Sequence, residues 1–434
     1  MGELTPSRSM KLLRHVFISG LIGSALFAGP DAELAVERAD WDEVQLLSLA
    51  KRIHDKHLTL DTHLDVPGVL RRPGFDISKE HSWVDHASQV DFPRMKKGGL
   101  DGGFFVVFVR QGPLTSEGRA KAIDEGFLIT NLIRETVETH ADESGLATTP
   151  AEAMALREAG RHVVFMGIEN GYVIGRNIDL LETYHDLGVR YFGLVHTRNN
   201  DLADSSTDRS GPRHFGLSEL GGVAVDECNR LGLMIDVSHA ADSTVWDVLA
   251  RTKAPVLASH SGAYAAHPNA RNLNDALLRQ IAAGGGVVQM NAFSFYLTEI
   301  PPDAARDEAI AAWRAKYAAL QPWSMEVDIQ RRIEIMRIKN EFPPSSSEVT
   351  LVADHVDHMV KVMGINHVGF SGDFDGGGGV WGLMDVSQMM NLTMELLRRG
   401  YSEKDLGKMW GGNVMRVLGE VQEIAAKLQA ENKG

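Results

Sequence analysis

Histidines and acidic residues stand at the ends of short apolar stretches throughout this 434-residue chain. Neutral imidazoles and carboxylates are ligands for zinc and related divalent cations, and one carboxylate can bridge two of them. The set is large enough to hold two metal ions and to leave groups for proton transfer. We therefore expect metal-assisted hydrolysis at a carbonyl or phosphoryl group. The residues are His63, Asp65, Glu169, His196, His239, His260 and Asp373.

Position along the chain predicts which of these residues hold metal. His63 and Asp65 are two residues apart on one expected strand, so their side chains project to the same face and can chelate one ion. Glu169 ends an apolar stretch, where a carboxylate is costly unless it is paired or metal-bound, and it is the expected bridge. His239 and His260 end consecutive stretches and are therefore expected as neighbours.

Other residues are expected to act on the substrate. His196 is placed to donate to the oxyanion of a tetrahedral intermediate. Asp373 is the expected proton carrier to the leaving amine, and Asp375, two residues further on, is the alternative. Arg271, in the segment HPNARNL, could clamp a substrate carboxylate with two hydrogen bonds. A surface salt bridge is the alternative role for this arginine.

Parallel strands must bring these distant residues together. The apolar stretches lack the two-residue alternation of a half-exposed strand, which indicates burial on both faces. Helical patterns separate them, so we expect a parallel sheet, and eight such units predict a closed (β/α)8 barrel with every carboxyl end on one face. The expected strands are 57–63, 103–109, 162–168, 189–195, 233–238, 255–259, 286–292 and 367–372, and the clearest helices are 117–141, 178–187, 217–231, 242–252 and 274–284.

Residues 294–348 interrupt this alternation between the seventh and eighth strands. They contain two charged helical stretches and are longer than a simple crossover. An insertion at this end of a barrel forms either a lid or partner surface, or a solvated helical hairpin with no role in the chemistry. The predicted fold is thus an α/β TIM-like barrel with a helical insertion between strands 7 and 8, in one domain from 33 to 434.

Composition limits partners and compartment. The net charge of −14 argues against binding to nucleic acids or anionic membranes. Basic residues precede the apolar run 16–28, as in a secretory leader, and this run is shorter than the ~20 residues of a membrane-spanning helix. We predict a leader over 1–32 and no membrane span in the mature chain. The enzyme would be exported, periplasmic or secreted, if the leader is cleaved, and cytoplasmic otherwise.

Several fragments together resemble the membrane (renal) dipeptidase family of zinc peptidases, within the metal-dependent amidohydrolase barrel group. They occur in the family's order and are DTHLDVP (61–67), GIENG (167–171), GLVHTRNN (193–200), DVSH (236–239), SHSGAYAAHPNARNL (259–273) and GDFDG (372–376). The resemblance implies a (β/α)8 barrel with two Zn²⁺ per chain. Nitrogen and oxygen ligands would also accept Mn²⁺ or Co²⁺.

The resemblance also implies a role for each residue. The first zinc would be held by His63, Asp65 and Glu169, and the second by Glu169, His239 and His260. His196 and Arg271 would bind the intermediate and the C-terminal carboxylate of the substrate, and Asp373 would transfer the proton. The implied reaction is hydrolysis of dipeptides by a hydroxide held between the metals, with tolerance of a D-residue at the C-terminal position. A homodimer is also implied.

The first fragment departs from the family pattern, which usually has glycine before the histidine and Asn-Asp after it. Here Thr62 and Leu64 flank His63, so the groups that support the ligands are expected to differ. Two other functions fit the residues. One is an amidohydrolase for a cyclic amide, lactam, ester, phosphoester or deamination substrate, which would need no carboxylate clamp. The other is a metal-binding barrel without catalysis.

Overall fold

The computed structural model describes residues 41–343 and 348–431, and residues 41–434 cluster as one compact unit. The leader predicted over 1–32 lies outside the described residues and stays a prediction. Within the described part, no helix is both long and apolar enough to cross a membrane.

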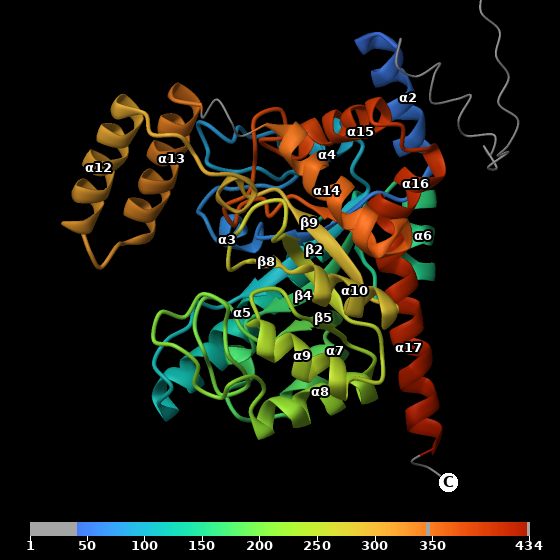
Figure 1. Ribbon diagram of the computed structural model, residues 1–434. Coiled ribbons are helices and arrows are strands. Elements are labelled where there is room, and N and C mark those ends of the chain that lie inside the picture. The colour runs from blue at the N-terminus through green and yellow to red at the C-terminus, as the bar shows by residue number, and fades with distance from the viewer. Residues whose placement is uncertain (1–40, 344–347, 432–434) are drawn as a thin grey trace, which may run out of the picture. The chain divides into compact units, whose positions relative to one another are not determined.

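Parallel strands form a nearly closed barrel, as predicted (Figure 1). At the seam, the β1–β10 pair is joined by the backbone of Asp65, whose N–H donates to Phe374 O at 2.9 Å. All eight expected strands are confirmed, in the same order around the barrel as along the chain. They are β1 (Leu60–Leu64), β2 (Gly102–Phe108), β4 (His162–Glu169), β5 (Val189–Gly193), β6 (Met234–Asp236), β7 (Leu257–Ala263), β9 (Val287–Asn291) and β10 (Val368–Ser371).

Two short strands were not expected from the sequence. β3 (Ser144–Leu146) pairs with β4 and β8 (Asn272–Leu273) pairs with β7, both off the main strand order. Neither has a long apolar run, because only two or three residues of each take part in pairing. β6 is also shorter than the predicted stretch 233–238.

Helices cover the outside of the barrel at the places that the sequence predicts (Figure 1). Local signals fix their ends: Thr149 caps α6, its hydroxyl accepts from Glu152 N, and Pro150 takes the first turn. The main helices are α2 (Glu43–Lys56), α5 (Ser116–Thr139), α6 (Pro150–Glu158), α7 (Leu180–Asp186), α8 (Glu219–Leu231), α9 (Asp242–Arg251), α10 (Asp275–Ala283), α14 (Val349–Met363), α15 (Met389–Arg398) and α17 (Asn413–Glu431).

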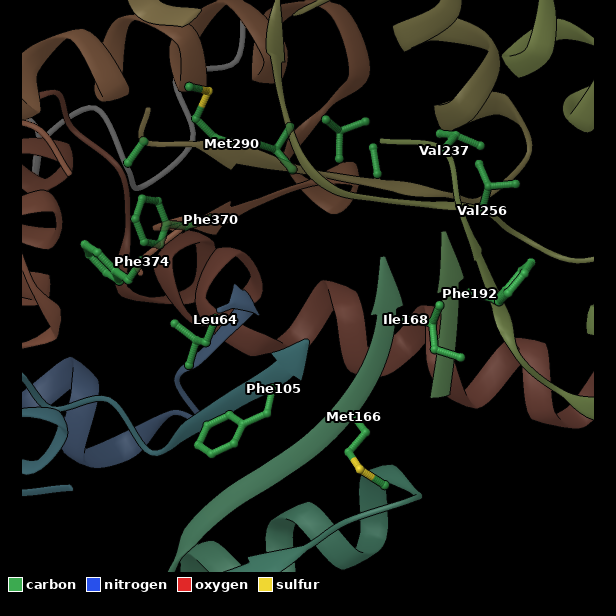
Figure 2. Packing of buried hydrophobic residues seen from close by; sticks show 14 of the residues in the cluster. Leu64, Phe105, Met166, Ile168, Phe192, Val237, Val256, Met290, Phe370 and Phe374 are labelled. Atoms are coloured by element: carbon green, nitrogen blue, oxygen red, sulfur yellow. The ribbon is translucent and has the colours of Figure 1, made fainter. Parts of the chain in front are cut away.

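Successive residues of the strands belong alternately to two apolar clusters. On β4, Val164 and Ile168 belong to a cluster that also takes residues from most of the covering helices. Figure 2 shows members of this cluster, among them Ile168, Leu64 and Phe374. Val163 and Phe165 belong to a second cluster, which takes residues from β1, β2, β4, β5, β6, β7 and β9 and from the first half of α17. The second cluster therefore fills the barrel interior. Glu169 has the same two-residue phase as Phe165, so its side chain also points inward.

The insertion folds as a helical hairpin of α12 (Ala304–Ala318) and α13 (Met325–Glu341), after the short α11 (Ser294–Leu297). The two long helices lie side by side (Figure 1). Trp313 Nε1 donates to Arg331 O at 2.9 Å, and the Tyr317 hydroxyl donates to Glu334 Oε2 at 2.7 Å. No residue of α13 is fully buried, so the hairpin is held by such polar contacts more than by a core of its own.

The buried His54 of α2 makes stability depend on pH. Its Nδ1–H donates to Gly99 O at 2.9 Å and its Nε2 accepts from Thr393 Oγ1 at 2.7 Å, so the ring is neutral. Burial lowers the pKa of His54 to about 4. The unfolded chain takes up this proton near pH 6.5, so the contribution of the neutral ring is complete above that pH and is lost as the pH falls towards 4.

When the pH falls from 7 to 5, the free energy of unfolding of the wild type should therefore decrease by about 2 kcal/mol more than that of the His54→Gln variant. Urea titrations at equal metal content measure this difference. His86→Gln, at an exposed histidine, is the matched control and should follow the wild type. Equal losses in wild type and His54→Gln would contradict the prediction.

Candidate metal centre

The carboxylate of Glu169, at the end of β4, lies among imidazoles from four other strand ends. Its Oε1 is 3.0 Å from His239 Nε2, 3.3 Å from His260 Nε2, 3.6 Å from His63 Nε2 and 3.9 Å from His196 Nε2. Glu169 is only 4% exposed. The structure thus brings together residues that are up to about 200 positions apart, as a barrel with one active face requires.

Three overlapping groups of these side chains could each hold a metal ion. Within each group, the nitrogen and oxygen atoms lie within 4.8 Å of one another. Glu169 belongs to two groups, and so does His63, so neighbouring ions would share ligands. The groups are His63, Glu169 and His260; Glu169, His196 and His239; and His63, Asp65 and Asp373.

The grouping differs from the two ligand sets that the resemblance implies. Asp373 shares a group with His63 and Asp65, and His196 shares one with Glu169 and His239. The residues expected to act on the substrate are therefore in contact with the expected ligands. This closeness suits a reacting group that must touch both metal and protein.

The buried nitrogens of this cluster converge on Glu169, and one of them has no hydrogen-bond partner among the described residues. His239 Nε2 and His260 Nε2 are 2.9 Å apart and both face Glu169. His63 Nε2 is buried and has no hydrogen-bond partner among the described residues. Because buried polar atoms normally have partners, a group of this kind indicates an ion, so the residues present fit a divalent metal.

Further residues hold two of the imidazoles with Nε2 towards Glu169. His260 Nδ1 donates to Ser259 Oγ at 2.8 Å, and Ser259 Oγ donates in turn to Asp236 Oδ2 at 2.6 Å. His63 Nδ1 lies 3.1 Å from the Tyr191 hydroxyl. Such supporting hydrogen bonds fix the orientation of metal-binding histidines.

Electrostatics show an excess of buried negative charge. Burial raises the pKa of Glu169 to about 8, with the charge of His63 opposing the shift and those of Asp65 and Asp373 adding to it. Burial would lower the pKa of His63, yet the charges of Glu169 and Asp65 outweigh it and raise that pKa to about 10. Protons or cations are therefore needed to balance the carboxylates, and a divalent cation does so while the imidazoles stay neutral and serve as its ligands.

Two supporting aspartates were missed by the sequence reasoning. Asp61 is fully buried and accepts from His63 N at 3.0 Å and Gly372 N at 2.8 Å, which ties the end of β1 to the end of β10. Asp236 accepts from Ser238 N and Ser259 N, and these hydrogen bonds tie the end of β6 to β7. The available signal was an acidic residue inside an apolar stretch, just before each histidine.

The backbone is unusual at the strand ends. His239 has φ of 67° and Asp373 has φ of 52°, in the left-handed region that non-glycine residues rarely adopt. Asp375 (φ of 65°) follows the same pattern. Strained backbone of this kind persists where the surrounding structure fixes it, and it is concentrated at functional sites.

Asp373 and Asp375 have different surroundings. Asp373 Oδ2 accepts from Asn291 Nδ2 at 3.0 Å, and the carboxylate faces His63. Asp375 instead exchanges hydrogen bonds with Gln89: its Oδ1 accepts from Gln89 N at 2.7 Å. Of the two candidates for proton transfer, Asp373 is the one grouped with the expected ligands.

The glycines at 376–379, directly after Asp375, leave room for the carboxylates of Asp65 and Asp373. A Cβ on Gly376 would lie 2.0 Å from Asp65 Oδ2 and 2.5 Å from Asp373 Oδ1. Gly378 N donates to Asp373 O at 2.7 Å, which folds the run back on the strand end. The run therefore leaves the space in which the two carboxylates approach each other.

Arg271 is buried beside the cluster, in the loop after β7. Its Nη2 donates to His260 O at 3.2 Å, and its guanidinium lies 5.3 Å from the centre of the Tyr296 ring. Its Nε has no hydrogen-bond partner among the described residues, and the residue is 4% exposed. Arg271 is thus not part of a surface salt bridge, and a buried guanidinium with a free donor suits a carboxylate.

A cavity of about 780 Å³ opens at the cluster. Its wall includes Asp65, Glu169 and His239 on the barrel side. The hairpin insertion contributes Trp323, Met325, Asp328, Ile329 and Arg332 to the same wall. Of the two roles considered for the insertion, the structure favours one at the site, since the hairpin lines the cavity.

Comparisons with known proteins agree with this geometry. Residues 47–432 match the family described as membrane dipeptidase, peptidase family M19. Dipeptidase aclJ of Aspergillus oryzae is 34% identical over 355 residues, covering 80% of this chain and 74% of that protein.

Solved structures give the same result. The probable dipeptidase PvdM from Pseudomonas aeruginosa has a TM-score of 0.76 and 30% identity, covering 88% of this chain and 100% of that one. A metallopeptidase from Rhodobacter sphaeroides, solved with a phosphinate mimic of L-Ala-D-Ala, has a TM-score of 0.67 and 25% identity, covering 84% and 99%. The chain therefore belongs to the membrane dipeptidase family, peptidase family M19, and is a metallopeptidase with the fold of its relatives.

Proposed function

We propose that the protein is a binuclear zinc dipeptidase that hydrolyses the single peptide bond of dipeptides. The observation that carries this proposal is the gathering of imidazoles around the buried Glu169, with a nitrogen of His63 left without a hydrogen-bond partner. His63, Asp65 and Glu169 would hold one zinc, and Glu169, His239 and His260 the other. The same donors also fit Mn²⁺ or Co²⁺.

The chain's own residues would divide the remaining work. When bound, the two cations would supply an activated water and polarise the scissile carbonyl. His196, beside Glu169 and partly exposed to the cavity, would donate a hydrogen bond to the carbonyl oxygen as it gains charge. Asp373, held by Asn291, would accept a proton and pass it to the leaving amine.

Arg271 favours dipeptides over other amides. Its buried guanidinium would bind the C-terminal carboxylate of the substrate, and a cyclic amide or simple ester has no such group. The L-Ala-D-Ala mimic bound in the Rhodobacter sphaeroides relative supports tolerance of a D-residue next to this carboxylate. Two further proposals rest on the sequence alone: export, from the basic and apolar pattern of the leader, and a homodimer, from the family resemblance.

A hydrolysis screen tests the reaction. Wild-type protein with about two zinc ions per chain should cleave some of a panel of L,L- and L,D-dipeptides. Glu169→Gln should lose zinc and reduce turnover by about a thousandfold, because both ions depend on this carboxylate. Glu125→Gln, at another carboxylate of the cavity wall, should keep both the zinc content and the turnover of the wild type. If zinc-loaded wild-type protein cleaves none of the dipeptides, the proposed reaction is wrong.

The carboxylate clamp has a test of its own. Arg271→Ala should lower kcat/KM for dipeptides by about a hundredfold, since a buried charge partner is lost. Hydrolysis of an ester without a free carboxylate should change little. Arg271→Lys should recover only part of the loss, because an ammonium cannot bind a carboxylate in the bidentate way. Equal losses on both substrates would assign Arg271 a structural role.

Because Gly376 packs directly against the carboxylates of Asp65 and Asp373, a side chain at this position should weaken metal binding. In Gly376→Ala the new methyl group would push Asp65 and Asp373 apart, so zinc affinity should fall by about tenfold or more. Gly68→Ala is the matched control, because Gly68 also lines the cavity and a Cβ there meets nothing within 4 Å. Zinc titration with a competing chelator compares the variants. Wild-type affinity in Gly376→Ala would show that the carboxylates can move freely.

A further inference from the structure

Arginines are concentrated in the wall of the cavity, and most are neutralised or engaged. Arg71 pairs with Glu125 at 2.8 Å, and Arg332 pairs with Asp328 at 2.9 Å. Arg72 donates to two backbone carbonyl groups. These three arginines therefore have partners inside the protein.

Arg110 and Arg198 differ from the other arginines of the wall. Among the described residues, neither guanidinium has a hydrogen bond, and neither has a carboxylate within ion-pair distance. Both residues are exposed and line the cavity. Arg110 follows β2 and Arg198 follows β5, and these strands lie on the two sides of β4, whose last residue is Glu169. Two guanidinium groups without an ion pair thus follow the strands on either side of β4, and the charge of Asp208 acts on Arg198 only from a longer distance.

These charges reach the reacting region. Arg110, Arg198 and His196 all line the cavity. Phe108, two residues before Arg110, places its ring 4.6 Å from the ring of His196. A substrate that contacts His196 therefore lies within the field of Arg110.

Arg271 lies on the other side of the barrel. In the order of the strands, β2 and β7 are opposite each other, and Arg271 belongs to the loop after β7. If Arg271 holds the C-terminal carboxylate and the scissile bond lies at Glu169, the N-terminal residue extends towards β2, where its side chain can reach Arg110. Arg198, after β5, follows the strand on the other side of β4.

We propose that Arg110 and Arg198 form a subsite for an anionic side chain on the N-terminal residue of the dipeptide. This proposal rests on the proposed dipeptidase function and names its substrate class: dipeptides that carry a second negative charge, besides the C-terminal carboxylate. Paired arginines elsewhere in the wall would not compete for this charge, because their own carboxylates already neutralise them. The volume of the cavity leaves room for a long acidic side chain.

Kinetics with two isosteric substrates test the subsite. For zinc-loaded wild-type protein, kcat/KM should be about tenfold higher for L-Glu-L-Ala than for L-Gln-L-Ala, since two partly exposed charge pairs distinguish them. In the double variant Arg110→Gln/Arg198→Gln this ratio should fall to about one, with L-Gln-L-Ala unchanged. Arg314→Gln, at an exposed arginine of α12 outside the cavity wall, should keep the wild-type ratio.

The outcomes separate this subsite from the proposed reaction. Equal kcat/KM for the two substrates in the wild type, with both cleaved, would overturn the subsite and leave the dipeptidase function intact. An equal loss on both substrates in the double variant would also overturn it and would make these arginines, rather than Arg271, the clamp for the C-terminal carboxylate. Cleavage of neither substrate, nor of any other dipeptide, would overturn the function and the subsite together.

Discussion

A carboxylate buried among imidazoles is the constraint on which the rest of this structure depends. Glu169 is almost wholly shielded from water, and burial alone would favour its protonated form. The Nε2 atoms of His239 and His260 lie 2.9 Å from each other and 3.0 and 3.3 Å from its Oε1, so several ligand atoms converge on one point. Such a cluster is stable only if positive charge balances it, and divalent cations meet that need while using every nitrogen and oxygen as a ligand.

The barrel supplies the geometry that this cluster requires. Each member lies within a barrel strand or at most three residues beyond its end, so the backbone pairing of the strands restricts its position. Asp61 and Asp236 add hydrogen bonds across neighbouring strand ends, and Ser259 orients His260. Inside the barrel, Gly167 leaves the space that the Tyr191 ring fills, and Tyr191 in turn contacts His63. The support for the cluster therefore reaches several layers into the core.

Much of the barrel and of the cluster could be predicted from the sequence. Strands buried on both faces leave uninterrupted apolar runs, and a histidine or carboxylate at the end of such a run, as in Glu169 and His260, is conspicuous. The short strands β3 and β8 leave no such run. The positive φ of His239 and the role of Gly376 depend on neighbours from distant segments, and no local pattern encodes them. The same holds for the hairpin, whose helices were predictable but whose place in the cavity wall was not.

The central claim is that Glu169 bridges two metal ions at the carboxyl ends of the strands. A crystal structure of the zinc-loaded protein, with anomalous scattering measured at the zinc edge, tests it most directly. The account predicts two peaks about 3.5–4 Å apart, each next to one carboxylate oxygen of Glu169, with His63 at one peak and His239 and His260 at the other. A single peak, or two peaks that Glu169 does not join, would contradict it.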